Sequence, residues 1–209
     1  MDGPSSQVLA AFGLNDPPVR LSGGQGETWC SGTVVLKRAD LESTWRAGVL
    51  SDLPESKVFR VARPVPSRTG EWVAFGWEAS ELLAGATDVR RQDEVLVAGA
   101  AFHEAVSGLG RPDFIDARND PWAAGDRVAW GEQSVGGSTA YTDLVGPLVA
   151  ARRPVELRSQ VVHGDLPGNV MFADGQPPAI IDWPVYWRPP SWAAAVAVAD
   201  ALCGPPMRL

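Results

Sequence analysis

Apolar residues recur with two different periods along the chain. Short β-branched and aromatic runs predict strands at 33–37, 58–65 and 72–77. Residues 40–53 instead carry a helical repeat that Pro54 ends, with apolar positions four apart at Leu41, Trp45, Val49 and Leu53. The N-terminal third is therefore predicted to be a small sheet that carries one helix, preceded by a short helix at 5–14.

The pattern changes after Glu78. Residues 88–109 predict a helix that can bury Val95, Leu96, Ala100, Phe102 and Val106. The next stretch, 111–137, is rich in Pro, Asp, Gly and Arg without a sustained period. It is either a substrate-facing loop region or an irregular connection. A further helix is predicted from about 139 to 151.

The C-terminal part alternates short apolar strands with turns. Strands are predicted at 161–162, 170–172 and 179–181, with Asp174-Gly175 as the turn between the last two. Residues 192–202 are apolar nearly all round, which predicts a buried core helix capped by Ser191.

Composition and charge narrow the class of protein. Of 209 residues 45% are hydrophobic, enough for a globular core, and the net charge of −7 argues against a nucleic-acid partner. Cys30 and Cys203 lie far apart in the sequence, which predicts neither a disulfide framework nor a zinc site.

The N-terminus lacks a targeting pattern, and the longest apolar stretch, 192–199, is too short to cross a bilayer. We therefore expect a cytoplasmic protein without a membrane partner. The nine tryptophans are scattered and are expected to pack in the core.

Two carboxylates and an amide follow the predicted C-terminal strands. Asp165 and Asn169 lie between the first two, and Asp182 follows the third. Phosphoryl transfer requires a carboxylate that orients the attacking hydroxyl and accepts its proton, together with oxygen ligands that hold magnesium against the phosphates. These three residues supply that set.

The same residues carry a resemblance to the aminoglycoside phosphotransferase and choline kinase group of the protein-kinase-like superfamily. His163-Gly164-Asp165 with Asn169 resembles the catalytic loop of that group, and Ile181-Asp182-Trp183 resembles its metal-binding strand end. The resemblance implies that Asp165 is the catalytic base, that Asn169 and Asp182 bind magnesium, and that His163 braces the loop. Residues 183–189 further resemble an actinobacterial subgroup of these kinases.

The order of motifs extends the resemblance toward the N-terminus. The corner of Gly23, Gly24 and Gly26 precedes a strand ending in Lys37, like the phosphate-covering loop and phosphate-pairing lysine of the group. Read alone, the corner is an ordinary hairpin turn and Lys37 a surface lysine. The resemblance further implies a helical Glu that pairs with Lys37, here Glu42, and adenine contacts from the backbone of 77–80, with Trp77 and Glu78 as the binding residues.

The fold class implied is α+β: a protein-kinase-like two-lobed fold with a small antiparallel-sheet N-lobe and a mainly helical C-lobe. We expect a nucleotide-binding lobe at 1–78 and a catalytic lobe at 79–209 that is incomplete, because the chain ends 27 residues after Asp182. Three residues separate Asp165 from Asn169 where the group usually has four. The loop is therefore expected to be tighter, with Gly168 supplying unusual backbone angles.

The function expected is an ATP- and magnesium-dependent phosphotransferase acting on a hydroxyl of a small molecule, such as an aminoglycoside, an amino alcohol or a related metabolite. A module that binds nucleotide without turnover is one alternative. A metal-dependent hydrolase that uses His163, Asp165 and Asp182 as ligands is another. His103, on the predicted helix, receives no role.

Overall fold

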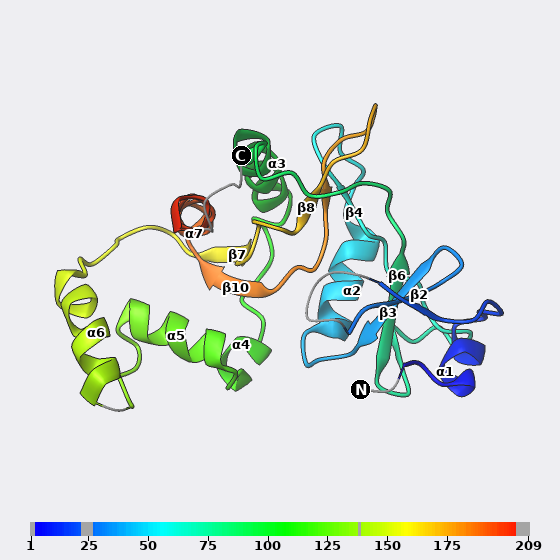
Figure 1. Ribbon diagram of the computed structural model, residues 1–209, viewed down its shortest axis with the longest axis horizontal. Helices are drawn as coiled ribbons and strands as arrows, with labels where there is room; N and C mark the ends of the chain where they lie inside the picture. The colour runs from blue at the N-terminus through cyan, green and yellow to red at the C-terminus, as the bar shows by residue number, and fades with distance from the viewer. Residues whose placement is uncertain (1–2, 22–26, 138, 204–209) are drawn as a thin grey trace. The chain divides into compact units, whose positions relative to one another are not determined.

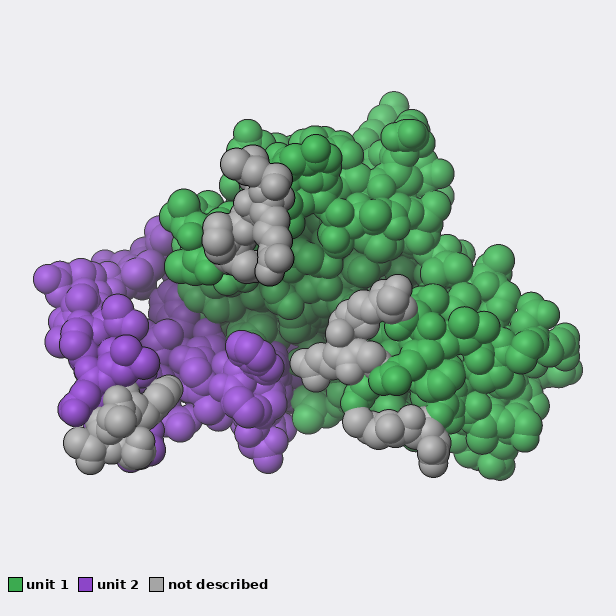
Figure 2. All heavy atoms as spheres, viewed as in Figure 1, with its two compact units in different colours: residues 1–111, 159–209 green, residues 112–158 purple. Residues whose placement is uncertain are grey.

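Two compact units make up the chain, which a computed structural model describes over residues 3–21, 27–137 and 139–203. The first unit joins Met1–Arg111 to Ser159–Leu209, and the second is Pro112–Arg158 (Figure 2). This division follows contacts within the chain and does not test the expected lobes at 1–78 and 79–209, which stay a prediction.

The N-terminal part of the first unit is a five-stranded antiparallel sheet (Figure 1). Its strands follow the order β1-β2-β3-β6-β5 and are β1 (Val19–Arg20), β2 (Trp29–Ser31), β3 (Val34–Arg38), β5 (Val73–Ala74) and β6 (Trp77–Glu81). Helix α1 (Ser6–Ala11) buries Val8 against this sheet. The small predicted sheet is thus confirmed.

Strand alternation decides which side chains of this sheet enter the core. Leu36 and Trp77 pack with Val8 in the core cluster and are almost fully buried. Their neighbours Lys37 and Glu78 are directly opposite each other in the β3–β6 ladder and therefore lie on the other face. This face carries the candidate site.

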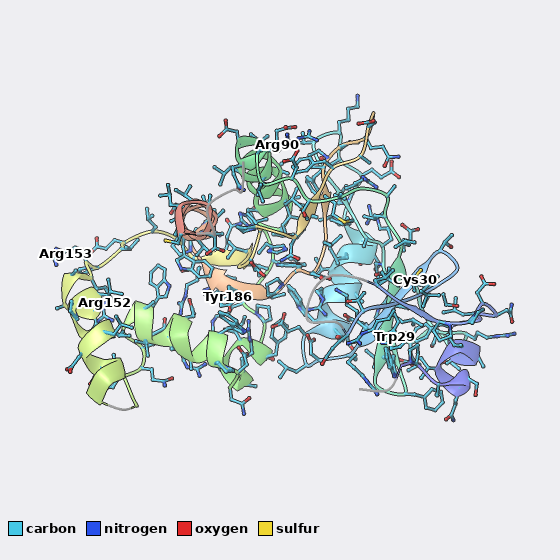
Figure 3. The ribbon with its side chains drawn as sticks, viewed as in Figure 1. Trp29, Cys30, Arg90, Arg152, Arg153 and Tyr186 are labelled. Carbon is cyan, nitrogen blue, oxygen red and sulfur yellow. The ribbon has the colours of Figure 1, made fainter. Side chains whose placement is uncertain are left out.

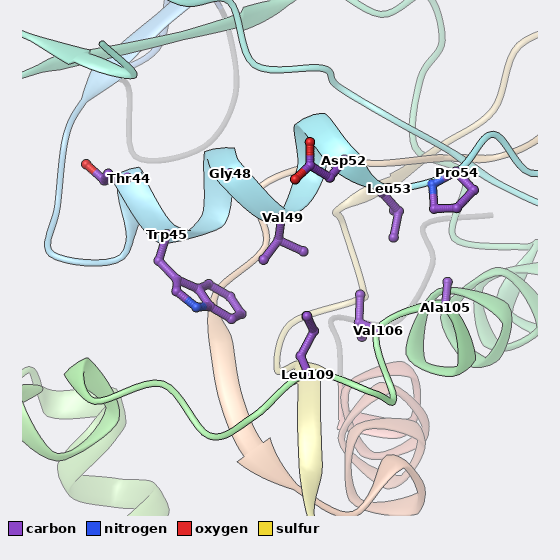
Figure 4. A pocket seen from close by; sticks show the side chains of 10 residues that line it. All are labelled: Thr44, Trp45, Gly48, Val49, Asp52, Leu53, Pro54, Ala105, Val106 and Leu109. Carbon is purple, nitrogen blue, oxygen red and sulfur yellow. The ribbon is translucent and has the colours of Figure 1, made fainter.

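Helix α2 (Ser43–Asp52) confirms the helix predicted at 40–53. Asp40 fixes its start, because its carboxylate accepts hydrogen bonds from the Glu42 backbone at 2.9 Å and the Ser43 hydroxyl at 3.0 Å. The apolar stripe that predicted the helix is not its most buried side. Trp45 and Val49 line an open groove of about 490 Å³ between α2 and the end of α3 (Figure 4).

The rest of the first unit is built from helices α3 (Gln92–Ala105) and α7 (Pro190–Cys203), which pack together, and from two small sheets. Strands β4 (Arg60–Val61), β9 (Ala179–Ile180) and β8 (Val170–Met171) form one sheet, in the order β4-β9-β8. Strands β7 (Gln160–His163) and β10 (Val185–Arg188) form the other. The fold class is α+β, as predicted.

Two local predictions were wrong, and one strand was missed. The strand expected at 72–77 is a hairpin, because Phe75 and Gly76 both adopt positive φ and turn the chain between β5 and β6. Strand β10 was missed. Helix α7 begins at Pro190, before the expected cap, and is buried along one side only, since Ala193 and Ala197 are buried while Leu202 is 81% exposed.

The second unit contains α4 (Phe114–Ala117), α5 (Pro121–Trp130) and α6 (Thr139–Ala151). Helix α6 was predicted, whereas α4 and α5 fall in the stretch expected to be irregular. Asp120 caps α5 by accepting a hydrogen bond from the Ala123 backbone at 2.9 Å, Pro121 is its first residue, and Gly131 ends it with a φ of 75°. These start and stop signals mark a helix within a stretch that has no sustained period as a whole.

Within the described part of the chain, no helix combines the length and the apolar character that crossing a bilayer requires.

Candidate active site

The ends of three strands bring Asp165, Asn169 and Asp182 to one place in the first unit. Asp165 follows β7, Asn169 precedes β8 and Asp182 follows β9. The backbone N–H of Ile181 donates to the Asn169 carbonyl at 3.0 Å, which ties the segment before Asp182 to the loop that carries the other two. The strand-end arrangement expected from the sequence is therefore present.

The loop between Asp165 and Asn169 is a tight turn. The Asn169 N–H donates to the Leu166 carbonyl at 3.0 Å, and Gly168 has a φ of 78°, so its predicted unusual backbone is confirmed. The Asn169 amide nitrogen donates to the Asp165 carbonyl at 2.7 Å and to its carboxylate at 3.0 Å. The shorter spacing thus still holds Asn169 against Asp165.

His163 braces this loop from inside the core. It is fully buried, its Nδ1 accepts the Asp165 N–H at 3.1 Å, and its Nε2 lies 3.0 Å from the Ile181 carbonyl. Because Nδ1 accepts, the proton of the neutral ring is on Nε2 and is donated to Ile181. Burial lowers the pKa of His163 to about 4, so the ring stays neutral near pH 7. The predicted bracing role is confirmed.

His103 on α3 is a second brace that the sequence interpretation missed. Its Nε2 accepts the backbone N–H of His163 at 2.9 Å, and desolvation lowers its pKa to about 4 as well. The position of a histidine along a helix does not show whether its ring is exposed or is buried and hydrogen-bonded to another segment. Only the packing of α3 against β7 shows its role.

The segment that carries Asp182 is held on several sides. Asp182 has a φ of 48°, a left-handed conformation that is uncommon for residues other than glycine. The Trp183 indole donates to the Val162 carbonyl at 3.1 Å, and its ring packs edge-on against Phe102 with centroids 4.9 Å apart. The Gly164 N–H donates to the Pro184 carbonyl at 3.1 Å. The surrounding structure thus fixes the backbone on which Asp182 depends.

Lys37 reaches this segment from β3. Its ammonium group forms an ion pair with the Asp182 carboxylate, and the two side chains are 27% and 39% exposed. The sheet face that carries Lys37 is therefore the face that meets the segment of Asp182. This placement favours the phosphate-pairing role over that of an ordinary surface lysine.

Among the contacts of the described residues, Glu42 has other partners than the expected Lys37. Its Oε2 accepts the Val185 N–H at 3.0 Å and lies 3.4 Å from Nη1 of Arg46. Glu42 lies at the very start of α2, where its side chain is directed to the segment after Asp182 while Lys37 pairs with Asp182 itself.

Trp77 and Glu78 are also placed differently from the expectation that their backbone meets adenine. They belong to β6, a central strand that pairs with β3 on one side and β5 on the other, so the sheet uses their backbone groups. Trp77 is buried in the core, and Glu78 binds Arg46. Strand β6 continues to Glu81, so a segment with free backbone groups that follows this strand can begin only after Glu81.

Asp165 is partly withdrawn from solvent and lies near another carboxylate. Its pKa is raised, first by desolvation and then by the Asp200 carboxylate on α7, while the hydrogen bond from Asn169 opposes the shift. Tyr186 on β10 lies close to the loop, because a Cβ at Gly164 would overlap its ring (Figure 3). The predicted phosphate cradle of Gly23, Gly24 and Gly26 lies outside the described residues.

The family of this chain follows from its sequence as a whole. The model of the phosphotransferase enzyme family that includes the aminoglycoside phosphotransferases matches residues 28–205. The chain belongs to this phosphotransferase family. The recognition made from the catalytic loop and the metal-binding strand end is therefore confirmed.

Solved structures of low sequence identity share the fold of this family member. A choline/ethanolamine kinase family protein from Mesorhizobium loti aligns with a TM-score of 0.53 at 18% identity, covering 91% of this chain and 66% of its own. An amicoumacin kinase in complex with AMP-PNP, Ca²⁺ and Ami aligns with a TM-score of 0.54 at 14% identity, covering 81% of this chain and 60% of its own. The chain thus spans less than two thirds of both. No curated protein matches it significantly.

The residues of this phosphotransferase family member fit a hard divalent cation. Asp182 offers a carboxylate, and Asn169 offers its amide oxygen, since its amide nitrogen is used by Asp165. Carboxylate and amide oxygens are the ligand types that Mg²⁺ prefers. Among the described residues no group of three or more His, Cys, Asp or Glu side chains forms a cation site, so this pair would need oxygens from water or substrate.

Proposed function

We propose that this chain transfers the γ-phosphoryl group of ATP, with magnesium, to a hydroxyl group of a small molecule. The observation that carries the proposal is the convergence of Lys37 from the sheet with Asp182, Asn169 and Asp165 from three neighbouring strand ends. The amicoumacin kinase holds AMP-PNP and Ca²⁺ on the same fold, which supports a nucleotide and a divalent cation as ligands.

Each residue has a distinct role in the proposed reaction. Asp182 and Asn169 hold magnesium through oxygen, and Lys37 exchanges its contact with Asp182 for the α- and β-phosphates of ATP. The metal supplies neutralisation of charge on the phosphate oxygens. Asp165 orients the acceptor hydroxyl and receives its proton as the bond to the γ-phosphorus forms and the bond to ADP breaks.

The adenine is best placed after β6. The Leu82 N–H donates to Thr33, and Ala86 and Phe172 exchange two backbone hydrogen bonds. Among the hydrogen bonds of the described residues, none uses the backbone of Leu83, which lies between them. Its N–H and carbonyl are therefore suited to bind the edge of a base.

The acceptor is proposed to be cationic, such as an amino sugar or an amino alcohol. Asp200 contributes negative charge close enough to raise the pKa of Asp165, and the whole chain carries a net charge of −7. A positively charged acceptor would be attracted to this region and would lower the pKa of Asp165 toward the ionised form.

The test measures ATP consumption over a panel of aminoglycosides and amino alcohols, together with slow ATP hydrolysis without acceptor. Loss of a general base typically costs about 10²- to 10⁴-fold in rate, so Asp165→Asn should lower turnover by that factor while ADP binding is kept. Asp174→Asn, the same change in the exposed turn between β8 and β9, is the control and should keep the wild-type rate.

Equal rates for Asp165→Asn and the wild type, with ADP bound by both, would contradict the proposal and favour a nucleotide-binding module without turnover. The hydrolase alternative is disfavoured by geometry. His163 uses both ring nitrogens in hydrogen bonds to the backbone and has none left for a metal.

A further inference from the structure

Arg46 projects from α2 to the region between the sheet and the metal-binding segment. Its side chain is only 14% exposed, and Nη2 lies 3.0 and 3.1 Å from the two carboxylate oxygens of Glu78. Nη1 donates to the Trp183 carbonyl at 3.3 Å. One guanidinium group therefore joins three parts of the unit: α2, β6 and the residue that follows Asp182.

Glu42 provides a second connection from the start of α2. Its carboxylate accepts the Val185 N–H at 3.0 Å and lies 3.4 Å from Arg46, and its side chain is 7% exposed. Arg46 and Glu42 thus hold the backbone at residues 183 and 185, directly after Asp182. Both contacts are made by side chains one helical turn apart.

The other end of this cluster reaches Lys37. Glu78 and Lys37 are paired across the β3–β6 ladder, so they lie on the same face of the sheet. Arg46 binds Glu78 beside Lys37 and Trp183 beside Asp182, and therefore connects to both sides of the Lys37–Asp182 pair. Asp182 depends on such support, because its φ of 48° is unfavourable for a residue with a Cβ.

We propose that Arg46 is a positioning residue for phosphoryl transfer, which together with Glu42 and Glu78 holds Asp182 in the conformation that binds the metal. The inference rests on the proposed function and adds a residue to it. Arg46 acts through Asp182 and is not placed against the nucleotide. An arginine suits this role because its planar group can serve a carboxylate and a carbonyl at the same time, which a lysine cannot do.

The physical consequence of removing Arg46 is local. Glu42 and Glu78 would remain largely buried without their cation, and the Trp183 carbonyl would lose a donor. The segment after Asp182 would keep the contact of Val185 with Glu42 but would be held less firmly against α2 at Trp183. The affinity for nucleotide in the absence of metal should be unaffected, whereas the gain in nucleotide affinity that the metal provides should become smaller.

The experiment measures ADP binding by titration calorimetry, once with Mg²⁺ and once with EDTA, and takes the ratio of the two affinities. Arg46→Met should reduce this ratio by about tenfold, the usual effect of removing a partner that supports a metal ligand. Arg46→Lys should restore only part of it, because one ammonium group cannot reach both Glu78 and Trp183.

Arg63→Met is the matched control. Arg63 also supports α2, since its Nη1 donates to the Leu50 carbonyl at 2.5 Å, but it makes no contact with the segment after Asp182 among those of the described residues. It should lower thermal stability and leave the Mg²⁺ ratio at the wild-type value. Equal losses in both variants, or an unchanged ratio in folded Arg46→Met, would overturn the inference.

A reference variant separates this inference from the proposed function. If wild-type ADP binding does not depend on Mg²⁺, or if Asp182→Asn keeps the full dependence, the proposed metal site itself is wrong and the inference falls with it. Should Arg46→Met fail to fold by circular dichroism, Glu78→Gln replaces it, because it keeps the shape and removes the charge. A folded Glu78→Gln variant with the wild-type ratio would also overturn the inference.

Discussion

Two neutral histidines connect the Asp165–Asn169 loop to the core. His103 accepts a hydrogen bond from His163, and His163 bonds both the Asp165 N–H and the Ile181 carbonyl. Both rings are buried, and protonation of either would remove an acceptor and place a charge in the core. The loop is therefore held by groups that must stay uncharged.

We expect the free energy of unfolding to decrease as the pH is lowered from about 6.5 to about 4. The folded pKa of both histidines is about 4, against 6.5 for the free side chain, so the unfolded state binds more protons in this window. The free energy of unfolding should decrease on acidification by at most about 1.4 kcal/mol per pH unit for each ring. The raised pKa of Asp165 opposes this slope at its acid end.

Urea denaturation at pH 7, 6 and 5 measures this dependence. The chain has no other histidine, so His103→Gln should remove about half of the slope while its amide oxygen can still accept the His163 N–H. A variant with the full wild-type slope would contradict the assignment.

At this scale the sequence predicted much of the candidate site. Asp165, Asn169 and Asp182 were expected to meet because strand ends carry them, and backbone topology alone brings them together. Glu42, Trp77 and Glu78 were placed by analogy with positions along a motif. Their contacts depend on the exact start of α2 and on where β6 ends, and neither boundary is encoded by periodicity.

At the scale of elements, capping located a helix that the sequence pattern had not predicted. The stretch 111–137 as a whole shows no sustained apolar repeat, yet within it Asp120, Pro121 and Gly131 define the two ends of α5. Helix α4 has an acidic residue at the same position, Asp113, whose side chain makes no capping hydrogen bond. The two helices thus offer an internal comparison of the same residue type with and without a cap.

Asp120→Ala should destabilise α5 by about 1 kcal/mol, because the Ala123 N–H loses its acceptor. Its ion pair with Arg118 is lost as well, which adds little at a partly exposed position. Hydrogen exchange of peptides covering 121–130 reads out the change directly. Asp113→Ala is the control and should leave exchange in α4 close to wild type, and equal effects in both variants would argue against the cap.

At the scale of the whole molecule, burial is distributed unevenly between the two units. Of the described residues in the second unit, only Pro112 and Ala123 are buried. Trp122, Leu144 and Leu148 are each more than 70% exposed. The candidate site residues that are described all lie in the first unit, which also contains the buried core.

We therefore expect the second unit to open more readily than the first. Local opening is easiest where few apolar contacts are buried, so amides of α5 and α6 should exchange faster than those of α3 and β7. Hydrogen–deuterium exchange with mass spectrometry at pH 7 measures this difference. Uniform protection across both units would show that they unfold as one and would contradict the expectation.

The sequence by itself determined the family, the α+β class and the convergence of the three oxygen-bearing residues. These features depend on local order along the chain: strand-forming runs, the spacing of the catalytic loop and the glycine that closes it. The tertiary structure alone decided which face of the sheet carries Lys37, that His103 supports the loop, and that Arg46 joins α2 to the segment after Asp182. The reason is physical: a side chain's role is set by what packs against it, and residues far away in the sequence provide those contacts.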